Sequence, residues 1–346
     1  MNNKGRILIL DDSDEWKVTL RLLLENAGYY VDVAASLEEA QSYLQNSFYH
    51  VAIFDIRLVD SDTKNIQGLE LLEELYQNKM LGDMKIIVFS AYGTKELMRE
   101  TFRQYRVTDF LEKDNFDGTD FITTVKNAFS EIKLNLNLNV DWKFSSSEQA
   151  VLNLKLPGNI RVKKDTKLQK QLSVELSDLL SRLFYEADTI LVKPIKTGGS
   201  GTNVLIVEAF YENLGGSAPM VVKFGATKEI SVEVDNFKKY VQGFIESGRH
   251  AALIDTKYTS HLGGIVYKLL GTSGEHLESF AHYYSNSTIS QIKETLNNLF
   301  YGTCHSWYKS PGVIHPINLT EYYSKRMVIS KEKLFALLLG LKIKPI

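Results

Sequence analysis

Carboxylate, hydroxyl and ammonium side chains end a series of short apolar runs in the first 113 residues of the chain. Each run has the length and composition of a strand that is buried on both faces. Because the carboxyl ends of parallel strands meet at one edge of a sheet, we expect these side chains to converge. Three crowded carboxylates repel one another unless a divalent cation lies among them, and a ligand set made only of oxygens suits Mg²⁺. The residues are Asp11 and Asp12 after the first run, Asp55 after the third, Ser90 after the fourth and Lys113 after the fifth.

This cluster has the composition of a site for phosphoryl transfer to a carboxylate. One carboxylate can attack phosphorus, while a metal ion, an ammonium and a hydroxyl neutralise the phosphoryl oxygens. In these residues the segment from 5 to about 130 closely resembles the receiver domain of two-component response regulators. The resemblance implies that Asp55 is the phosphoacceptor, that Lys113 contacts the phosphate and that Ser90 is the switch hydroxyl. It also implies Mg²⁺ between Asp11, Asp12, Asp55 and the backbone carbonyl of Arg57, an aromatic switch at Phe110 and a histidine kinase as phosphoryl donor.

Alternating strand and helix patterns must position these residues. Five short apolar runs alternate with segments in which apolar residues recur at helical spacing. Five such units predict an α/β fold, a doubly wound, five-stranded parallel sheet of the flavodoxin-like type. The expected strands are 6–10, 30–34, 50–54, 85–89 and 109–111.

The pattern changes in the second half of the chain. A helical period over 167–187 gives way to the two-residue period of strands over 190–195, 204–211 and 220–224. A strand at 264–270 and helices at 232–245, 290–301 and 331–341 complete an α+β domain with a largely antiparallel sheet. We therefore expect a receiver at 1–133, a linker or connecting strands at 134–165 and a second domain at 166–346.

A glycine-rich turn between two strands precedes a lysine on the next strand. Glycines let the backbone approach a phosphate closely, and the lysine can reach its oxygens. Lys223 would pair with Glu233 on the following helix, although Glu229 competes for that role. This pattern resembles the small lobe of a protein kinase, and also the ternary complex associated domains of bacterial conflict systems. The nucleotide-binding residues implied are Gly198, Gly199, Ser200, Gly201, Lys223 and Glu233.

The motifs that complete a kinase are missing from this sequence. None of the seven histidines begins a His-X-Asp catalytic loop, and Asp-Phe-Gly does not occur. We therefore expect a second domain that acts by binding and is not an enzyme, with weak or no affinity for ATP. The alternative is that the chain is the front part of a nucleotide-dependent phosphotransferase whose large lobe is absent. Burial of Lys223 and Glu233 as a pair would make loss of Glu233 cost about 3 kcal/mol.

Composition limits the remaining possibilities. The chain of 346 residues has a net charge of −2 and one cysteine, which excludes an intrachain disulfide and gives no reason to expect nucleic acid as a partner. No apolar stretch reaches the roughly 20 residues that span a bilayer. We expect a cytoplasmic response regulator whose second domain binds an unknown protein. Phosphorylation would act either within one chain or through a homodimer, and the sequence leaves both open.

Overall fold

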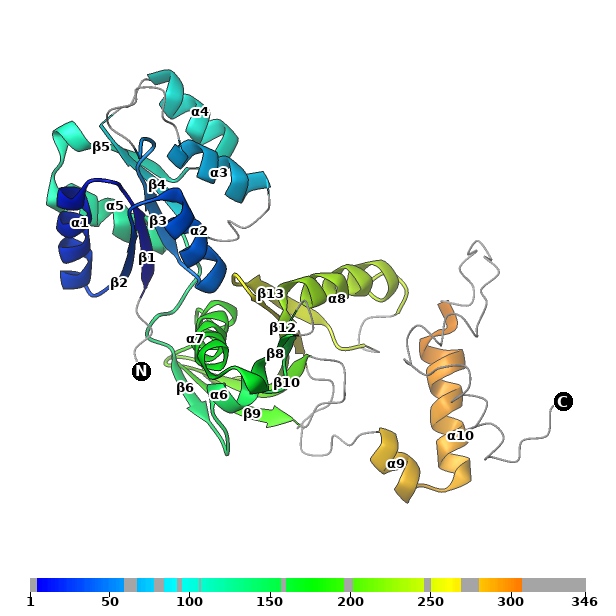
Figure 1. Cartoon of the computed structure of the whole chain (residues 1–346). Coiled ribbons are helices and arrows are strands. Elements are labelled where there is room, and N and C mark those ends of the chain that lie inside the picture. The colour runs from blue at the N-terminus through cyan, green and yellow to red at the C-terminus, as the bar shows by residue number, and fades with distance from the viewer. Residues whose placement is uncertain are drawn as a thin grey trace. The chain divides into compact units, whose positions relative to one another are not determined.

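The computed structural model describes residues 5–58, 67–77, 84–91, 95–105, 107–156, 160–195, 202–245, 250–268 and 280–306. The chain divides into two compact units, residues 1–287 and residues 288–346. The first unit contains a five-stranded sheet, a seven-stranded sheet and a short two-stranded sheet, and hydrophobic core clusters pack against the two larger ones (Figure 1).

The first sheet has five parallel strands in the order β2-β1-β3-β4-β5, as the alternating pattern predicts. The strands are β1 (Arg6–Leu10), β2 (Tyr30–Ala34), β3 (Val51–Phe54), β4 (Lys85–Ser90) and β5 (Asp109–Glu112). The helices that alternate with them are α1 (Asp14–Asn26), α2 (Leu37–Asn46), α3 (Gln67–Gln77), α4 (Lys95–Tyr105) and α5 (Gly118–Ser130).

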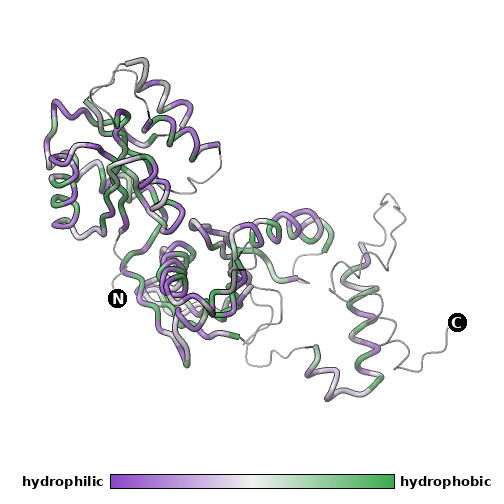
Figure 2. The backbone as a smooth tube through the Cα atoms, viewed as in Figure 1, coloured by the Kyte–Doolittle hydropathy of each residue, from purple (hydrophilic) through white to green (hydrophobic). Residues whose placement is uncertain are grey.

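Burial on both faces explains the continuous apolar runs of the central strands. The side chains of β3 are all buried, and alternate residues point into two separate core clusters on the two faces of the sheet. Figure 2 shows these central strands as the most hydrophobic part of the N-terminal region. The helices begin where polar side chains satisfy free backbone N–H groups: Ser13 caps α1 and Ser36 caps α2. The doubly wound α/β fold is therefore confirmed.

The second sheet has seven strands and is antiparallel except at one edge. Its path runs β13-β14-β12-β10-β9-β6, with β11 paired to β10, and β6 lies parallel to β9. The long helix α7 (Thr166–Leu183) contacts β14, where a Cβ on Gly264 would lie 3.0 Å from Leu183. The strands are β6 (Asn139–Trp142), β9 (Thr189–Ile195), β10 (Asn203–Tyr211), β11 (Gly215–Gly216), β12 (Met220–Ala226), β13 (Leu253–Tyr258) and β14 (Leu262–Lys268).

The segment 134–165 takes part in this second core. It contributes β6, the short helix α6 (Ser147–Val151), the strand pair β7 (Lys155–Leu156) and β8 (Ile160–Arg161), and a 3-10 turn over Val162–Lys164. Val151, Leu154 and Val162 are buried in the same cluster as the apolar face of α7. We call residues 134–268 the second domain, because they share this sheet and core.

Several elements of the second domain differ from the sequence prediction. Helix α8 (Thr227–Tyr240) begins five residues earlier than the predicted 232, because β12 runs directly into it without turn residues. Strand β13 was not predicted, since its sequence L-I-D-T-K-Y places polar residues at its centre and half-buries them.

The remaining described helices are α9 (Phe280–Asn286) in the first unit and α10 (Ile289–Asn297) in the second. Thr288 and Gln291 form a capping box at the start of α10, which continues into a π-helical turn over Asn298–Thr303. The helix predicted at 331–341 lies outside the described residues. Among the helices that are described, none combines the length and the apolar composition that a membrane span requires.

Candidate functional site

Three carboxylates meet at the carboxyl end of the first sheet. Asp11 and Asp12 follow β1, and Asp55 follows the neighbouring strand β3, so the parallel register brings them together. One oxygen of each carboxylate lies within 4.8 Å of the others. Asp11 and Asp55 are 1% and 3% exposed, which removes most of the water that would screen their repulsion.

Lys113 supplies the positive charge that faces this cluster. It follows β5, and its Nζ lies 2.5 Å from Asp55 Oδ2 and 2.8 Å from Asp11 Oδ2. The ammonium also lies 6.0 Å from the ring centre of Trp16 and 5.6 Å from that of Phe89. Burial opposes the charge on Lys113, but the two carboxylates outweigh it and raise its pKa.

The cluster keeps an excess of negative charge. Burial raises the pKa of Asp11 to about 6, against the opposing effect of Lys113, and the nearby Asp55 carboxylate adds to the rise. Asp12 Oδ1 is buried and has no hydrogen-bond partner among the described residues. An orphaned buried carboxylate oxygen beside two further carboxylates fits a hard divalent cation with oxygen ligands, and Mg²⁺ is such a cation.

The other predicted switch residues lie around this cluster. Ser90 ends β4 and is fully buried. Phe110 lies on β5 and packs, partly buried, against the core cluster on one face of the sheet. The backbone N–H of Arg57 donates to Asp55 Oδ1 at 3.2 Å, which places the Arg57 backbone beside the acceptor carboxylate.

Two contributors were missed in the sequence. Gly68 near the start of α3 lies so close to the acid cluster that a Cβ would be 1.9 Å from the carbonyl oxygen of Asp55. Trp16 on α1 packs edge-on against Phe89 and Phe116, and with them forms an aromatic wall beside Lys113. A glycine inside a helical pattern is the signal for such a close approach, because helix propensity disfavours it there.

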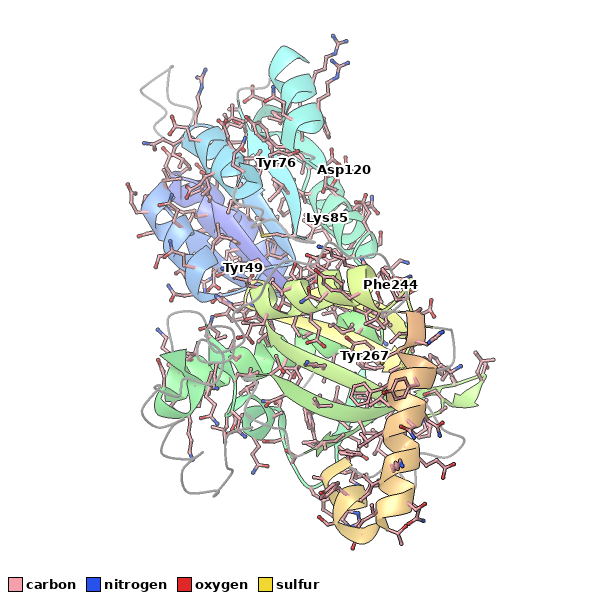
Figure 3. The ribbon with its side chains drawn as sticks, turned by 90° about the vertical axis from the view of Figure 1, so that its right-hand side faces the viewer. Tyr49, Tyr76, Lys85, Asp120, Phe244 and Tyr267 are labelled. Carbon is pink, nitrogen blue, oxygen red and sulfur yellow. The ribbon has the colours of Figure 1, made fainter. Side chains whose placement is uncertain are left out.

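Of the predicted nucleotide-binding residues, the structure describes the lysine and the glutamate and brings these two together. Lys223 on β12 lies 2.5 Å from Glu233 Oε2 on α8, so Glu233 is its partner in preference to Glu229. Tyr267 on β14 donates to the other oxygen of Glu233 at 3.1 Å, and Figure 3 labels it on the second sheet. The side chains of Lys223 and Glu233 are 27% and 29% exposed, so the pair is not fully buried. Gly198, Gly199, Ser200 and Gly201 lie outside the described residues.

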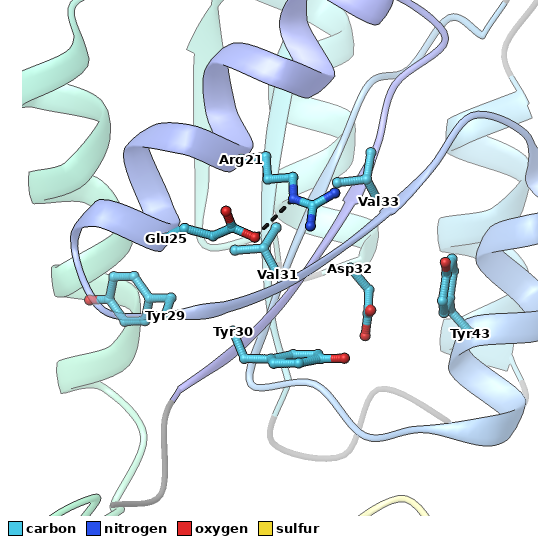
Figure 4. A pocket seen from close by; sticks show the side chains of 8 residues that line it. All are labelled: Arg21, Glu25, Tyr29, Tyr30, Val31, Asp32, Val33 and Tyr43. Atoms are coloured by element: carbon cyan, nitrogen blue, oxygen red, sulfur yellow. Dashed lines mark hydrogen bonds and ion pairs between the residues drawn. The ribbon is translucent and has the colours of Figure 1, made fainter.

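A surface pocket lies away from both sites, beside the edge strand β2 (Figure 4). Arg21 and Glu25, one turn apart on α1, form an ion pair of 2.8 Å at its rim. Tyr30, Asp32 and Tyr43 also line it. None of the predicted site residues contributes to this pocket.

Comparison with known families matches both parts of the chain. Residues 7–126 match the model of the response regulator receiver domain, and these residues contain the whole acid cluster with Lys113. The N-terminal part of the chain is a response regulator receiver domain. Residues 187–331 match ternary complex associated domain 9. The resemblances to the receiver and to the ternary complex associated domains are therefore confirmed, whereas the resemblance to a protein-kinase small lobe stays a prediction.

Individual curated relatives match about a third of this chain or less. The alginate biosynthesis transcriptional regulatory protein AlgB of Pseudomonas putida is 34% identical over 112 residues, which are 32% of this chain and 23% of that protein. The photosynthetic apparatus regulatory protein RegA of Rhodobacter capsulatus is 26% identical over 87 residues, 25% of this chain and 44% of that protein. The chain thus spans less than half the length of these relatives.

Among solved structures, a CheY-like response regulator receiver domain protein from Methanospirillum hungatei is similar to this chain. It is 28% identical, and the match covers 37% of this chain and 95% of that one, with a TM-score of 0.33.

Proposed function

We propose that the receiver accepts a phosphoryl group on Asp55 from a histidine kinase and thereby switches the second domain, which acts by binding. The observation that carries the proposal is the buried Asp55 carboxylate, held between Lys113 and the carboxylates of Asp11 and Asp12. Related receivers occur in regulatory proteins, which supports a role in signal transduction.

In this reaction an oxygen of Asp55 attacks phosphorus. A bond forms between that oxygen and phosphorus, and the bond from phosphorus to the donor breaks, so that the donor leaves with the electron pair. Mg²⁺, when bound by Asp11, Asp12, Asp55 and the backbone carbonyl of Arg57, neutralises negative charge on the phosphoryl oxygens. Lys113 supplies a further positive charge, and the Ser90 hydroxyl can donate a hydrogen bond to the product.

Phosphorylation changes the charge that Lys113 faces. The ammonium now bonds two carboxylates, and a phosphoryl group on Asp55 offers it oxygens of greater charge. Rearrangement of Ser90 and Phe110 toward the new group would alter the surface near β4 and β5. The second domain would respond through its contact with the receiver or through self-association.

Intact-mass measurement with a small acyl phosphate tests the acceptor. The parent protein should gain one phosphoryl group only when Mg²⁺ is present, and Asp55→Asn should gain none. Asp120→Asn is the matched control, because it makes the same chemical change at an exposed position of α5. Equal adducts on Asp55→Asn and the parent protein would refute Asp55 as the acceptor.

A second function, nucleotide binding, is favoured by one observation. The Lys223–Glu233 pair has the arrangement by which kinase small lobes hold the phosphate-binding lysine. We propose that the pair is structural and that this chain transfers no phosphate from ATP. Calorimetry that found tight ATP binding, together with transfer of the γ-phosphate that is lost in Lys223→Met, would establish the phosphotransferase alternative instead.

A further inference from the structure

Helix α7 carries two buried carboxylates, and one of them bonds a residue at the amino end of the receiver sheet. Glu175 and Asp178 lie one turn apart on this helix, and both are 0% exposed. Each is bonded by a histidine that the phosphorylation site does not use. His50 precedes β3 in the receiver, and His261 lies in the turn between β13 and β14. Asp55 lies at the opposite end of β3 from His50.

The hydrogen bonds of His50 require a neutral ring. Its Nδ1 lies 2.9 Å from the backbone N–H of Arg6, which can only donate, so Nδ1 carries no proton. Its Nε2 lies 2.6 Å from Asp178 Oδ1 and therefore donates its proton to that carboxylate. With a proton on one nitrogen only, His50 is uncharged.

The hydrogen bonds of His261 require the opposite state. Its Nδ1 lies 2.9 Å from Glu175 Oε2, and its Nε2 lies 3.0 Å from the backbone carbonyl oxygen of Gln45 in the receiver. Both partners accept, so both ring nitrogens donate and the ring is an imidazolium. Burial lowers the pKa of His261, but the bonds to Glu175 and Gln45 outweigh this effect and raise it above 6.5.

The charges at this contact balance in the protonation state that the hydrogen bonds require. Imidazolium His261 faces Glu175, and Arg182 Nε lies 2.8 Å from Asp178 Oδ2. Glu175 Oε1 also accepts from the hydroxyl of Thr259 at 2.6 Å. The charged groups on the neighbouring receiver strands are paired as well. Arg6 pairs with Asp32, whose carboxylate also accepts a hydrogen bond from the hydroxyl of Tyr49. Lys85 pairs with Glu131, and Figure 3 labels Tyr49 and Lys85.

We call this contact the latch, and we propose that it is closed only while His50 is neutral and His261 is protonated. A proton added to Nδ1 of His50 would face the N–H of Arg6 and would put a charge on a ring that is 0% exposed. A proton lost from His261 would remove either its bond to Gln45 or its bond to Glu175. The docking of the second domain on the receiver therefore has a maximum in pH and weakens on both sides of it.

The latch is a second input to the domain contact. Only the four residues of β3, Val51–Phe54, separate His50 from the phosphoacceptor Asp55. Phosphorylation acts at one end of this strand and protons act at the other. The contact between the domains thus responds to pH even when Asp55 is unphosphorylated.

Nuclear magnetic resonance of the full chain labelled with ¹⁵N-histidine tests the two protonation states. At about pH 7 we expect His50 as the single tautomer with the proton on Nε2 and His261 with protons on both nitrogens. His50→Gln and His261→Gln assign the two signals. A cationic His50 or a neutral His261 in the docked protein would overturn the proposal.

Energy transfer between the two domains tests the opening. Labels on cysteines replacing Glu38 on α2 and Asn213 after β10, both exposed, report the docked state in a Cys304→Ala background. The transfer signal should fall on both the acid and the alkaline side of its maximum, while circular dichroism shows that the domains remain folded.

Variants separate the two limbs of this pH profile. His261→Lys keeps a cation up to about pH 10 and should abolish the alkaline fall below that pH. His50→Gln keeps a neutral donor and should abolish the acid fall. His261→Gln should increase the undocked population about tenfold. His305→Gln, at an exposed position, is the matched control and should leave the profile unchanged. A parent profile that is flat from about pH 5 to about pH 9 would overturn the latch.

Discussion

The two ends of the central strand β3 carry buried charge of different kinds. At the carboxyl end, three carboxylates face the single ammonium of Lys113, and a carboxylate oxygen of Asp12 has no partner among the described residues. At the amino end, the carboxylates of Asp178 and Glu175 each have a cation and further donors. A cluster with uncompensated charge requires a ligand, whereas a balanced one holds two parts of a protein together. We therefore infer chemistry at the carboxyl end and docking at the amino end.

Removal of a carboxylate from the balanced end should have the largest effect. Asp178→Ala removes the carboxylate that Arg182 Nε bonds in the buried contact and deprives His50 of its acceptor. We expect a loss of about 3–5 kcal/mol in the free energy of unfolding, since breaking a buried pair costs this much. Urea unfolding followed by fluorescence measures it.

The control for this experiment lies on the same helix. Lys170→Ala removes an exposed charge from α7 and should change the free energy of unfolding by less than about 0.5 kcal/mol. Equal unfolding midpoints for Asp178→Ala and Lys170→Ala would show that the buried charges at the amino end of β3 do not stabilise the fold.

A methyl group at Gly68 should disturb the backbone at the carboxyl end of β3, beside Asp55. Its Cβ would lie 1.9 Å from the backbone oxygen of Asp55, and backbone yields less readily than the tip of a side chain. We expect Gly68→Ala to cost about 1–3 kcal/mol and to slow phosphorylation by an acyl phosphate. Gly118→Ala is the matched control, because its Cβ would meet Leu23 at an ordinary 3.5 Å. If both variants take up phosphate at the parent rate, Asp55 does not depend on this close approach.

The sequence predicts the carboxyl end well for a topological reason. Parallel strands bring their ends to one edge, so Asp11, Asp55 and Lys113 could be placed together without any knowledge of side-chain packing. The pairing of Lys223 with Glu233 follows in the same way, from a strand and the helix that continues it.

The amino end could not be predicted in this way. His50 and Asp178 are 128 positions apart and belong to different domains, so that only the docking of these domains brings them together. Their local sequences are those of an ordinary strand start and an ordinary helix. Gly68 was missed for a related reason, because its role depends on how closely α3 approaches the backbone after β3.

The pH dependence of the free energy of unfolding tests the charge state of the buried groups at the amino end of β3. Because the folded state raises the pKa of His261, protonation of His261 stabilises the fold fully below about pH 6.5, and this contribution is lost as pH rises through the folded pKa. His261→Gln should therefore lower the melting temperature more at about pH 6 than at about pH 9. Thermal unfolding at a series of pH values measures both proteins. A difference that grows with pH would contradict an imidazolium at this position.

The smallest effect on stability is expected at the Lys223–Glu233 pair, whose charge balance and burial lie between those of the two ends of β3. The pair is matched in charge, like the latch, but with 27% and 29% exposure solvent screens both partners. The cost of about 3 kcal/mol for losing Glu233 applies to a fully buried pair, and this geometry does not meet that condition.

We expect Glu233→Ala to lower the free energy of unfolding by at most about 1 kcal/mol, with part of this loss due to the lost hydrogen bond from Tyr267. Lys223→Met should be close to neutral, because an unbranched apolar chain keeps the packing of the lysine stem. A double-mutant cycle with both substitutions isolates the pair from the contribution of Tyr267. A coupling energy near about 3 kcal/mol would show that the Lys223–Glu233 pair is as strongly desolvated as the latch.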